Sequence, residues 1–125
     1  MRALSLFAAG WVMVAGCGVA SAAQPYEGLW ASANKDCTDQ DSADRLSIEG
    51  GNRLYWYETR CTAREIKPDG ISAWKMRLSC EGEGEKVKSN PRVSIAADGR
   101  LVMDDGPVGQ GKHQTYVRCA IPGKR

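Results

Sequence analysis

Four cysteines are the residues of this chain whose type and spacing most directly suggest a chemistry. Apart from Cys17 near the start of the chain, the cysteines are separated by 24, 19 and 39 positions, at Cys37, Cys61, Cys80 and Cys119. These spacings contain no Cys-x-x-Cys pair, which argues against a redox motif or a zinc cluster. An even number of cysteines in a short exported domain is typical of structural disulfides. We therefore expect two disulfides, no metal and no cofactor.

Catalytic chemistry would have to use the one histidine and scattered acidic groups. His113 is the only histidine, and it has no second histidine or serine partner with which to form the usual pair of nucleophile and base. Glu58, Arg60 and His113 have the residue types of a phosphodiester-cleaving site, but nothing in the local sequence brings the three together. We predict no catalytic residues, and the alternative is a small hydrolase that uses Glu and Arg groups at a barrel mouth.

Alternating glutamates form a second possible site. Glu81, Glu83 and Glu85 recur every second residue, which in a strand would point three carboxylates to one side. Such a set could bind Ca²⁺ or supply an acid and a base. The interleaved glycines favour a solvated turn instead, with nearby lysines as countercharges. Residues 104–107, with the sequence DDGP, are also predicted to form a turn.

A set of tryptophan and arginine side chains is the strongest candidate for a binding surface. In the predicted strand registers Trp56, Arg60 and Arg64 point outward from one strand, and Arg77 points outward from the next. Tryptophan and arginine are the residues most enriched at interaction hot spots. We therefore predict that this face binds a protein, a glycan or an anionic lipid. The same predicted face carries Leu54, Glu58 and Lys75.

The elements that position these side chains are predicted to be strands. Short runs with alternating apolar residues are separated by Gly, Asn, Asp or Pro, and no helical periodicity is sustained. Tight turns between consecutive strands favour an antiparallel meander, and closure would remove exposed edges. The predicted fold is all-β, a small antiparallel meander barrel or sandwich of seven or eight strands with two disulfides. Strands are expected at residues 28–33, 45–49, 53–66, 71–81, 92–96, 100–104 and 114–120, with a short one at 85–88.

Turn lengths predict both the strand registers and the disulfides. A two-residue loop within residues 50–52 would place Leu46 and Ile48 on one face with Tyr55, Tyr57 and Cys61. Extending that hairpin brings Cys61 close to Cys37. The predicted disulfides are therefore Cys37–Cys61 and, by elimination, Cys80–Cys119.

Two further loops complete the predicted core. A four-residue loop at residues 67–70 pairs Ile66 with Ile71, and a three-residue loop at residues 97–99 aligns Val93 and Ile95 with Met103 and Leu101. In the last strand Val117, Cys119 and Ile121 share a face. The residues predicted to point inward are Trp30, Leu46, Ile48, Tyr55, Tyr57, Trp74, Met76, Leu78, Val93, Ile95, Leu101, Met103 and Val117.

Residues 1–23 have the features of a secretory signal peptide. A basic start is followed by an apolar run of about 14 residues, and Ala20-Ser21-Ala22 forms a small-x-small cleavage signal. The run is shorter than the roughly 20 residues of a membrane span. We expect a periplasmic or secreted protein. In the alternative, Val14-Ala15-Gly16-Cys17 acts as a lipobox, and Cys17 anchors the protein to a membrane.

The remaining chain, residues 24–125, is the size of one domain. Without Arg2 it carries 16 Lys and Arg against 15 Asp and Glu, with the two signs interspersed along the sequence. No long-range field would attract a polyanion, so nucleic acid is not an expected partner. We expect a monomer that binds a protein or an envelope component.

The opening of the first predicted strand carries a resemblance to a known group of proteins. Gly28-Leu29-Trp30 resembles the Gly-x-Trp opening of calycin-type barrels, which include small periplasmic protease inhibitors. The leader, this motif and a cysteine seven residues after Trp30 also resemble small exported bacterial proteins without an assigned function. The resemblance implies a barrel with Trp30 at one end. It assigns no functional residue, and the sequence lacks a Ser-Gly-rich segment of the kind associated with periplasmic lysozyme inhibitors.

Overall fold

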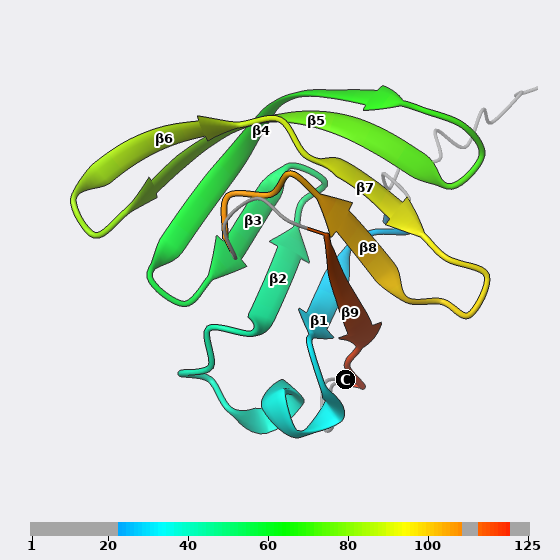
Figure 1. Ribbon diagram of the computed structural model, residues 1–125, viewed down its shortest axis with the longest axis horizontal. Helices are drawn as coiled ribbons and strands as arrows, with labels where there is room; N and C mark the ends of the chain where they lie inside the picture. Colours follow the sequence, from blue (N-terminus) through cyan, green and yellow to red (C-terminus); the bar gives the residue numbers. More distant parts are fainter. Residues whose placement is uncertain (1–22, 109–112, 121–125) are drawn as a thin grey trace, which may run out of the picture.

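The computed structural model describes residues 23–108 and 113–120 and places nine strands and one short 3₁₀ helix along them (Figure 1). Every strand pairing is antiparallel. In chain order the elements are β1 (Gly28–Ala31), η1 (Asn34–Thr38), β2 (Arg45–Glu49), β3 (Arg53–Trp56), β4 (Thr59–Pro68), β5 (Ala73–Gly82), β6 (Glu85–Ser89), β7 (Arg92–Ile95), β8 (Leu101–Asp104) and β9 (Gln114–Arg118).

Eight of the strands close into a barrel, and β6 is added outside it. The strands follow the order β4-β3-β2-β1-β9-β8-β7-β5, and pairing of β4 with β5 completes the circle. The first part of β5 pairs with β7, whereas its last five residues pair with β6. In Figure 1 the β5–β6 hairpin therefore extends away from the barrel. The predicted all-β antiparallel fold is confirmed, and it is a barrel with one extra strand.

The predicted register of β3 was wrong by one residue. Glu49 pairs with Arg53, so the loop between β2 and β3 has three residues. Gly50 and Gly51 in this loop have left-handed conformations, with φ angles of 60° and 78°. A one-residue shift exchanges the two faces of a strand. Leu54 and Trp56 consequently point into the barrel.

Both faces of β3 carry large apolar side chains, so the sequence pattern alone could not show which face points into the barrel. With the observed register Tyr55 is only half-buried, and Tyr57 is 47% exposed. The long strand predicted at residues 53–66 is also broken. Tyr57 and Glu58 form a two-residue turn between Trp56 and Thr59, with Glu58 at a φ of 65°.

Strands β4 and β5 form the longest hairpin, and its register differs from the predicted one. Ile66 pairs with Met76 rather than with Ile71, and Ile71 is fully exposed at the hairpin tip. A β-bulge at Arg64 lies between the pairs Ala63–Leu78 and Glu65–Arg77. Bulges redirect side chains, and here Arg64 adds an unpaired residue to the outer face.

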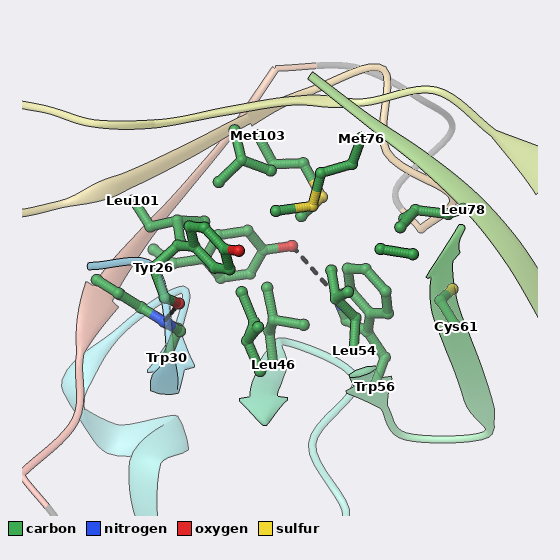
Figure 2. Close-up of a cluster of buried hydrophobic side chains, with 14 of the residues drawn as sticks. Tyr26, Trp30, Leu46, Leu54, Trp56, Cys61, Met76, Leu78, Leu101 and Met103 are labelled. Carbon is green, nitrogen blue, oxygen red and sulfur yellow. Dashed lines mark hydrogen bonds between the residues drawn. The ribbon is translucent and has the colours of Figure 1, made fainter. Parts of the chain in front are cut away.

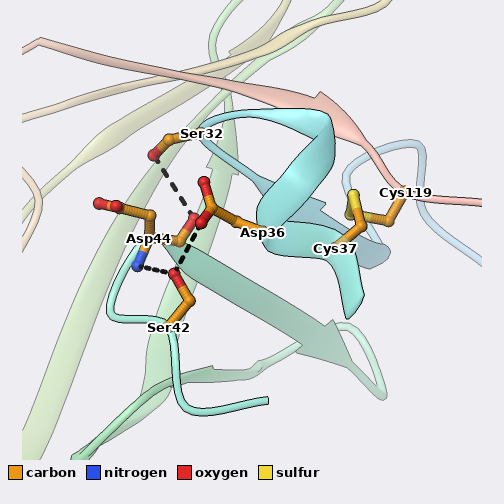
Figure 3. Close-up of a disulfide and its surroundings, with 6 residues drawn as sticks. All are labelled: Ser32, Asp36, Cys37, Ser42, Asp44 and Cys119. Atoms are coloured by element: carbon orange, nitrogen blue, oxygen red, sulfur yellow. Dashed lines mark hydrogen bonds between the residues drawn. A yellow bond between two sulfur atoms is a disulfide. The ribbon is translucent and has the colours of Figure 1, made fainter. Parts of the chain in front are cut away.

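The disulfides are Cys37–Cys119 and Cys61–Cys80, so both predicted pairings were wrong. Cys61 lies directly opposite Cys80 because the β4–β5 loop lies further along the chain than predicted, between Pro68 and Trp74. β1 pairs with β9, and η1 follows β1, which brings Cys37 next to Cys119 (Figure 3). In the same figure Ser42 donates a hydrogen bond to Asp36 and accepts one from the backbone of Asp44, which orders the chain between η1 and β2.

The barrel interior is filled by large side chains (Figure 2). Trp56 is 6% exposed, and its indole nitrogen donates a hydrogen bond to the hydroxyl of Tyr116 at 3.3 Å. Tyr116 takes the inward position in β9 that was predicted for Val117, which is half-buried. Eight predicted core residues are confirmed as buried and two, Trp74 and Ile95, as partly buried against the core. The eight are Trp30, Leu46, Ile48, Met76, Leu78, Val93, Leu101 and Met103.

Trp30 is held at its indole nitrogen and at its ring face. The nitrogen donates a hydrogen bond to the backbone carbonyl of Tyr26, and the Arg118 guanidinium lies 4.2 Å from the ring centroid. Arg118 also donates to the carbonyls of Pro25 and Glu27. A cation stacked on a buried indole contributes about 0.5 to 2 kcal/mol. These contacts tie the segment before β1 to the end of the last strand.

All of the predicted leader except its last residue, including the alternative lipidation site at Cys17, lies outside the described residues, as does Ile121. Within the described residues, no helix has the length and apolar character needed to cross a membrane.

Candidate binding groove on the outer face of the barrel

A groove of about 490 Å³ runs across the outer face of β3, β4, β5 and β6. Strand alternation places it there, because Leu54, Trp56, Cys61 and Cys80 point inward and their neighbours point outward. Cross-strand pairing then arranges the outward side chains in two rows. One row is Tyr55, Arg60, Glu81 and Lys86, and the second is Arg53, Thr62, Ser79 and Lys88.

Five cationic side chains line this groove, and we call it the basic groove. Among the described residues, Glu81 is the one acidic side chain that lines it. The five are Arg53, Arg60, Arg64, Lys86 and Lys88, and all are exposed. Directly opposed side chains on one sheet face are about 4.5 to 5.5 Å apart at Cβ. The fold therefore concentrates positive charge on one face of a chain whose total charge is close to zero.

The cations of the basic groove differ in ion pairing from four cations elsewhere on the barrel, Lys67, Arg77, Arg92 and Arg100. Among the described residues, none of the five lies within 4.0 Å of a carboxylate oxygen, whereas Lys67 and Arg77 pair with Glu65. Arg92 pairs with Asp69 at 2.8 Å. Arg64 makes one long hydrogen bond of 3.4 Å to the hydroxyl of Ser79. The groove cations thus keep donors with which to bind an external anion.

Two of the four predicted binding residues, Arg60 and Arg64, lie in the basic groove. Arg77 points to the same outer face but is ion-paired with Glu65. Trp56 was predicted to be an exposed anchor, and it is buried in the core instead. Leu54, which was predicted to share the outer face, is fully buried as well. The register change in β3 is the reason for both corrections.

The acidic candidates lie at the ends of two hairpins. Glu83 and Gly84 form the β5–β6 turn, so the alternating glutamates lie in and beside a solvated hairpin turn. An added Cβ at Gly82 would collide with the backbone oxygen of Glu58, which shows how closely the β3–β4 turn approaches this hairpin. A hydrogen bond with Glu83 raises the pKa of Glu58, with smaller contributions from burial and from the negative charge of Glu83.

The histidine is held by another part of the molecule. His113 Nδ1 lies 2.7 Å from Asp104 Oδ1, beside the end of β8. His113 does not line the depression that holds Glu58 and Arg60. No group of three or more potential metal ligands occurs within residues 23–108 and 113–120.

Sequence reasoning missed Arg53, Tyr55, Lys86 and Lys88 as lining residues of the groove. Lys86 and Lys88 were interpreted only as countercharges, although their spacing of two in a short strand already indicated a shared face. Arg53 and Tyr55 could not be placed there without the three-residue loop before β3. No protein-family model, curated protein or solved structure matches this chain.

Proposed function

We propose that the protein is an exported, non-catalytic binding module that captures an anionic group of a protein or envelope component in its basic groove. The observation that carries the proposal is the set of five cations without carboxylate partners around one groove. Guanidinium groups bind carboxylates and phosphates through two parallel hydrogen bonds. Disulfides are consistent with an oxidising compartment, where such a module would work.

The groove's composition favours a protein or envelope component over nucleic acid. Proteins that bind single strands combine a basic groove with several aromatic platforms for base stacking. In the part of the chain that the structure describes, Tyr55 is the one aromatic side chain that lines this groove. The filled barrel supplies a rigid scaffold. The β4–β5 ladder with its disulfide and the β5–β6 ladder together fix the relative positions of Arg60 and Lys86. A rigid, charged face favours ligand binding over catalysis as the function of this groove.

A second candidate is the small hydrolase. Its acid and base would be Glu58 and Glu83, which lie with Arg60 in a depression of about 330 Å³. The raised pKa of Glu58 is the feature that favours this candidate. Both carboxyl groups are exposed, however, so little desolvation is available to tune them. The binding module therefore ranks first.

Removing two groove charges should weaken binding to a carboxylate polymer. We expect the Arg60→Gln/Arg64→Gln variant to bind polyglutamate on the order of tenfold more weakly than the unmodified protein at low ionic strength, as measured by calorimetry. The matched control is Arg77→Gln/Arg92→Gln, which removes the same charge from side chains that are already ion-paired. We expect the control to change affinity by about twofold or less. Equal losses in the two variants would show that the groove has no special role.

A further inference from the structure

Within the described sheet, the outer edge of β6 is open along the whole strand. β6 is the last strand of the sheet order and pairs only with β5. Residues Glu85, Lys86, Val87 and Lys88 are all exposed. An unpaired strand edge presents backbone N–H and C=O groups that can pair with another extended chain. Figure 1 shows the β5–β6 hairpin projecting from the barrel.

The hairpin register identifies which backbone groups face outward. Gly82 pairs with Glu85 across a two-residue turn, and the pair that closes such a turn exchanges hydrogen bonds. Hydrogen-bonded pairs alternate along an antiparallel ladder, so Val87 also bonds to Cys80 of β5. The N–H and C=O groups of Lys86 and Lys88 therefore point to the open edge.

The side chains of β6 specify what an added strand would carry. Lys86 and Lys88 point to the basic groove, next to Glu81 and Ser79 of β5. Val87 points to the opposite sheet face and is 49% exposed. Cross-strand neighbours prefer opposite charges and paired apolar groups. An acceptable partner strand would thus place acidic residues on the groove face and an apolar residue beside Val87.

We infer that β6 is a docking edge for an extended segment of a partner protein, and that acidic and apolar residues alternate along this segment. This inference rests on the proposed function. The segment would add a strand to the sheet, as in other cases of peptide recognition by strand addition. Its backbone would bond to Lys86 and Lys88, and its carboxylates would face the groove cations. Self-pairing of two β6 strands around Val87 would set Lys86 of one copy against Lys88 of the other, and like charges placed opposite one another are destabilising.

A proline substitution separates strand addition from simple charge attraction. The probe is a short capped peptide in which glutamate alternates with valine. Lys88→Ala removes only the charge, whereas Lys88→Pro also removes the outward N–H and leaves the bonds of β6 to β5 in place. We expect Lys88→Pro to bind the peptide about tenfold more weakly than Lys88→Ala. Equal affinities for the two variants would overturn strand addition.

Two comparisons that change only the peptide keep the test decisive if the proline disturbs β6. A peptide of the same composition with its glutamates and valines in separate blocks should bind at least about tenfold more weakly to the unmodified protein. N-methylation of the peptide groups that face β6 should abolish binding, and N-methylation of the alternate groups should not. Equal binding of the two peptide orders would leave the groove proposal standing and refute the docking edge. A dimer in sedimentation that Lys88→Pro dissociates would instead identify a second copy as the occupant.

Discussion

Replacing Trp56 with alanine should lower the free energy of unfolding by about 3 to 5 kcal/mol, the range for truncating a buried aromatic side chain. Trp56 is 6% exposed and packs in the barrel core (Figure 2). Its loss would leave a cavity and remove the hydrogen bond to the Tyr116 hydroxyl. Because domains of this size have a net stability of about 5 to 15 kcal/mol, the variant would be close to unfolding. Urea denaturation followed by tryptophan fluorescence and circular dichroism measures the change.

Tyr57 provides the matched control, since it is the next residue and is 47% exposed. Tyr57→Ala should cost less than about 1 kcal/mol, as expected for a surface position. A larger loss for Tyr57→Ala than for Trp56→Ala would contradict the three-residue loop before β3. It would return the tyrosines to the core and Trp56 to the surface.

The disulfide between Cys37 and Cys119 should stabilise the protein more than the one between Cys61 and Cys80. The two bonds join residues 82 and 19 positions apart, and a longer loop constrains the unfolded chain more strongly. The chain-entropy relation gives about 4.5 kcal/mol for the first and about 3 kcal/mol for the second. We expect Cys37→Ala/Cys119→Ala to lose the larger amount in urea denaturation under non-reducing conditions.

Each double variant serves as the control for the other, because each keeps one disulfide and removes two cysteines. Intact mass before and after alkylation would establish that the remaining bond has formed. A larger loss for Cys61→Ala/Cys80→Ala would indicate that the β4–β5 hairpin, rather than the closure of the barrel at β1 and β9, depends most on its disulfide. Peptide mapping that joined Cys37 to Cys61 would contradict the observed pairing altogether.

The fold class could be predicted from the sequence because turn residues and alternation mark most strands locally. The hairpin at residues 97–99 is the clearest case, since only a three-residue loop keeps Val93 and Ile95 level with Met103 and Leu101. Its flanking strands have a single apolar face, so pattern and turn length agree. All four side chains were placed correctly relative to one another.

The β3 register could not be predicted because both of its faces are apolar. Leu54 with Trp56 and Tyr55 with Tyr57 form two competing alternations, and a loop rich in glycine fits either two or three residues. The bulge at Arg64 and the longer loop beyond Pro68 then shifted β4 against β5. Disulfide pairing depends on these long-range registers, so the pairing could not be predicted either.

The candidate site was predicted in part. Arg60 and Arg64 could be placed on the outer face because their positions alternate with the inward Cys61 and Ala63. The concentration of charge could not be foreseen, because the acidic and basic residues are interspersed along the chain. Three strands, β3, β4 and β6, bring these cations together from separate segments, while Glu65 and Asp69 neutralise other basic groups.

Amide chemical-shift mapping tests the basic groove most directly. Polyglutamate would be titrated into the isotopically labelled, disulfide-bonded protein, and shifts of the backbone amides would be recorded at low and physiological salt. A site on the outer face predicts that the largest shifts occur in the groove strands, at Arg53, Tyr55, Arg60, Arg64, Glu81, Lys86 and Lys88, and that they weaken with salt. Shifts of similar size around the ion-paired Lys67, Arg92 and Arg100, or none in the groove, would contradict it.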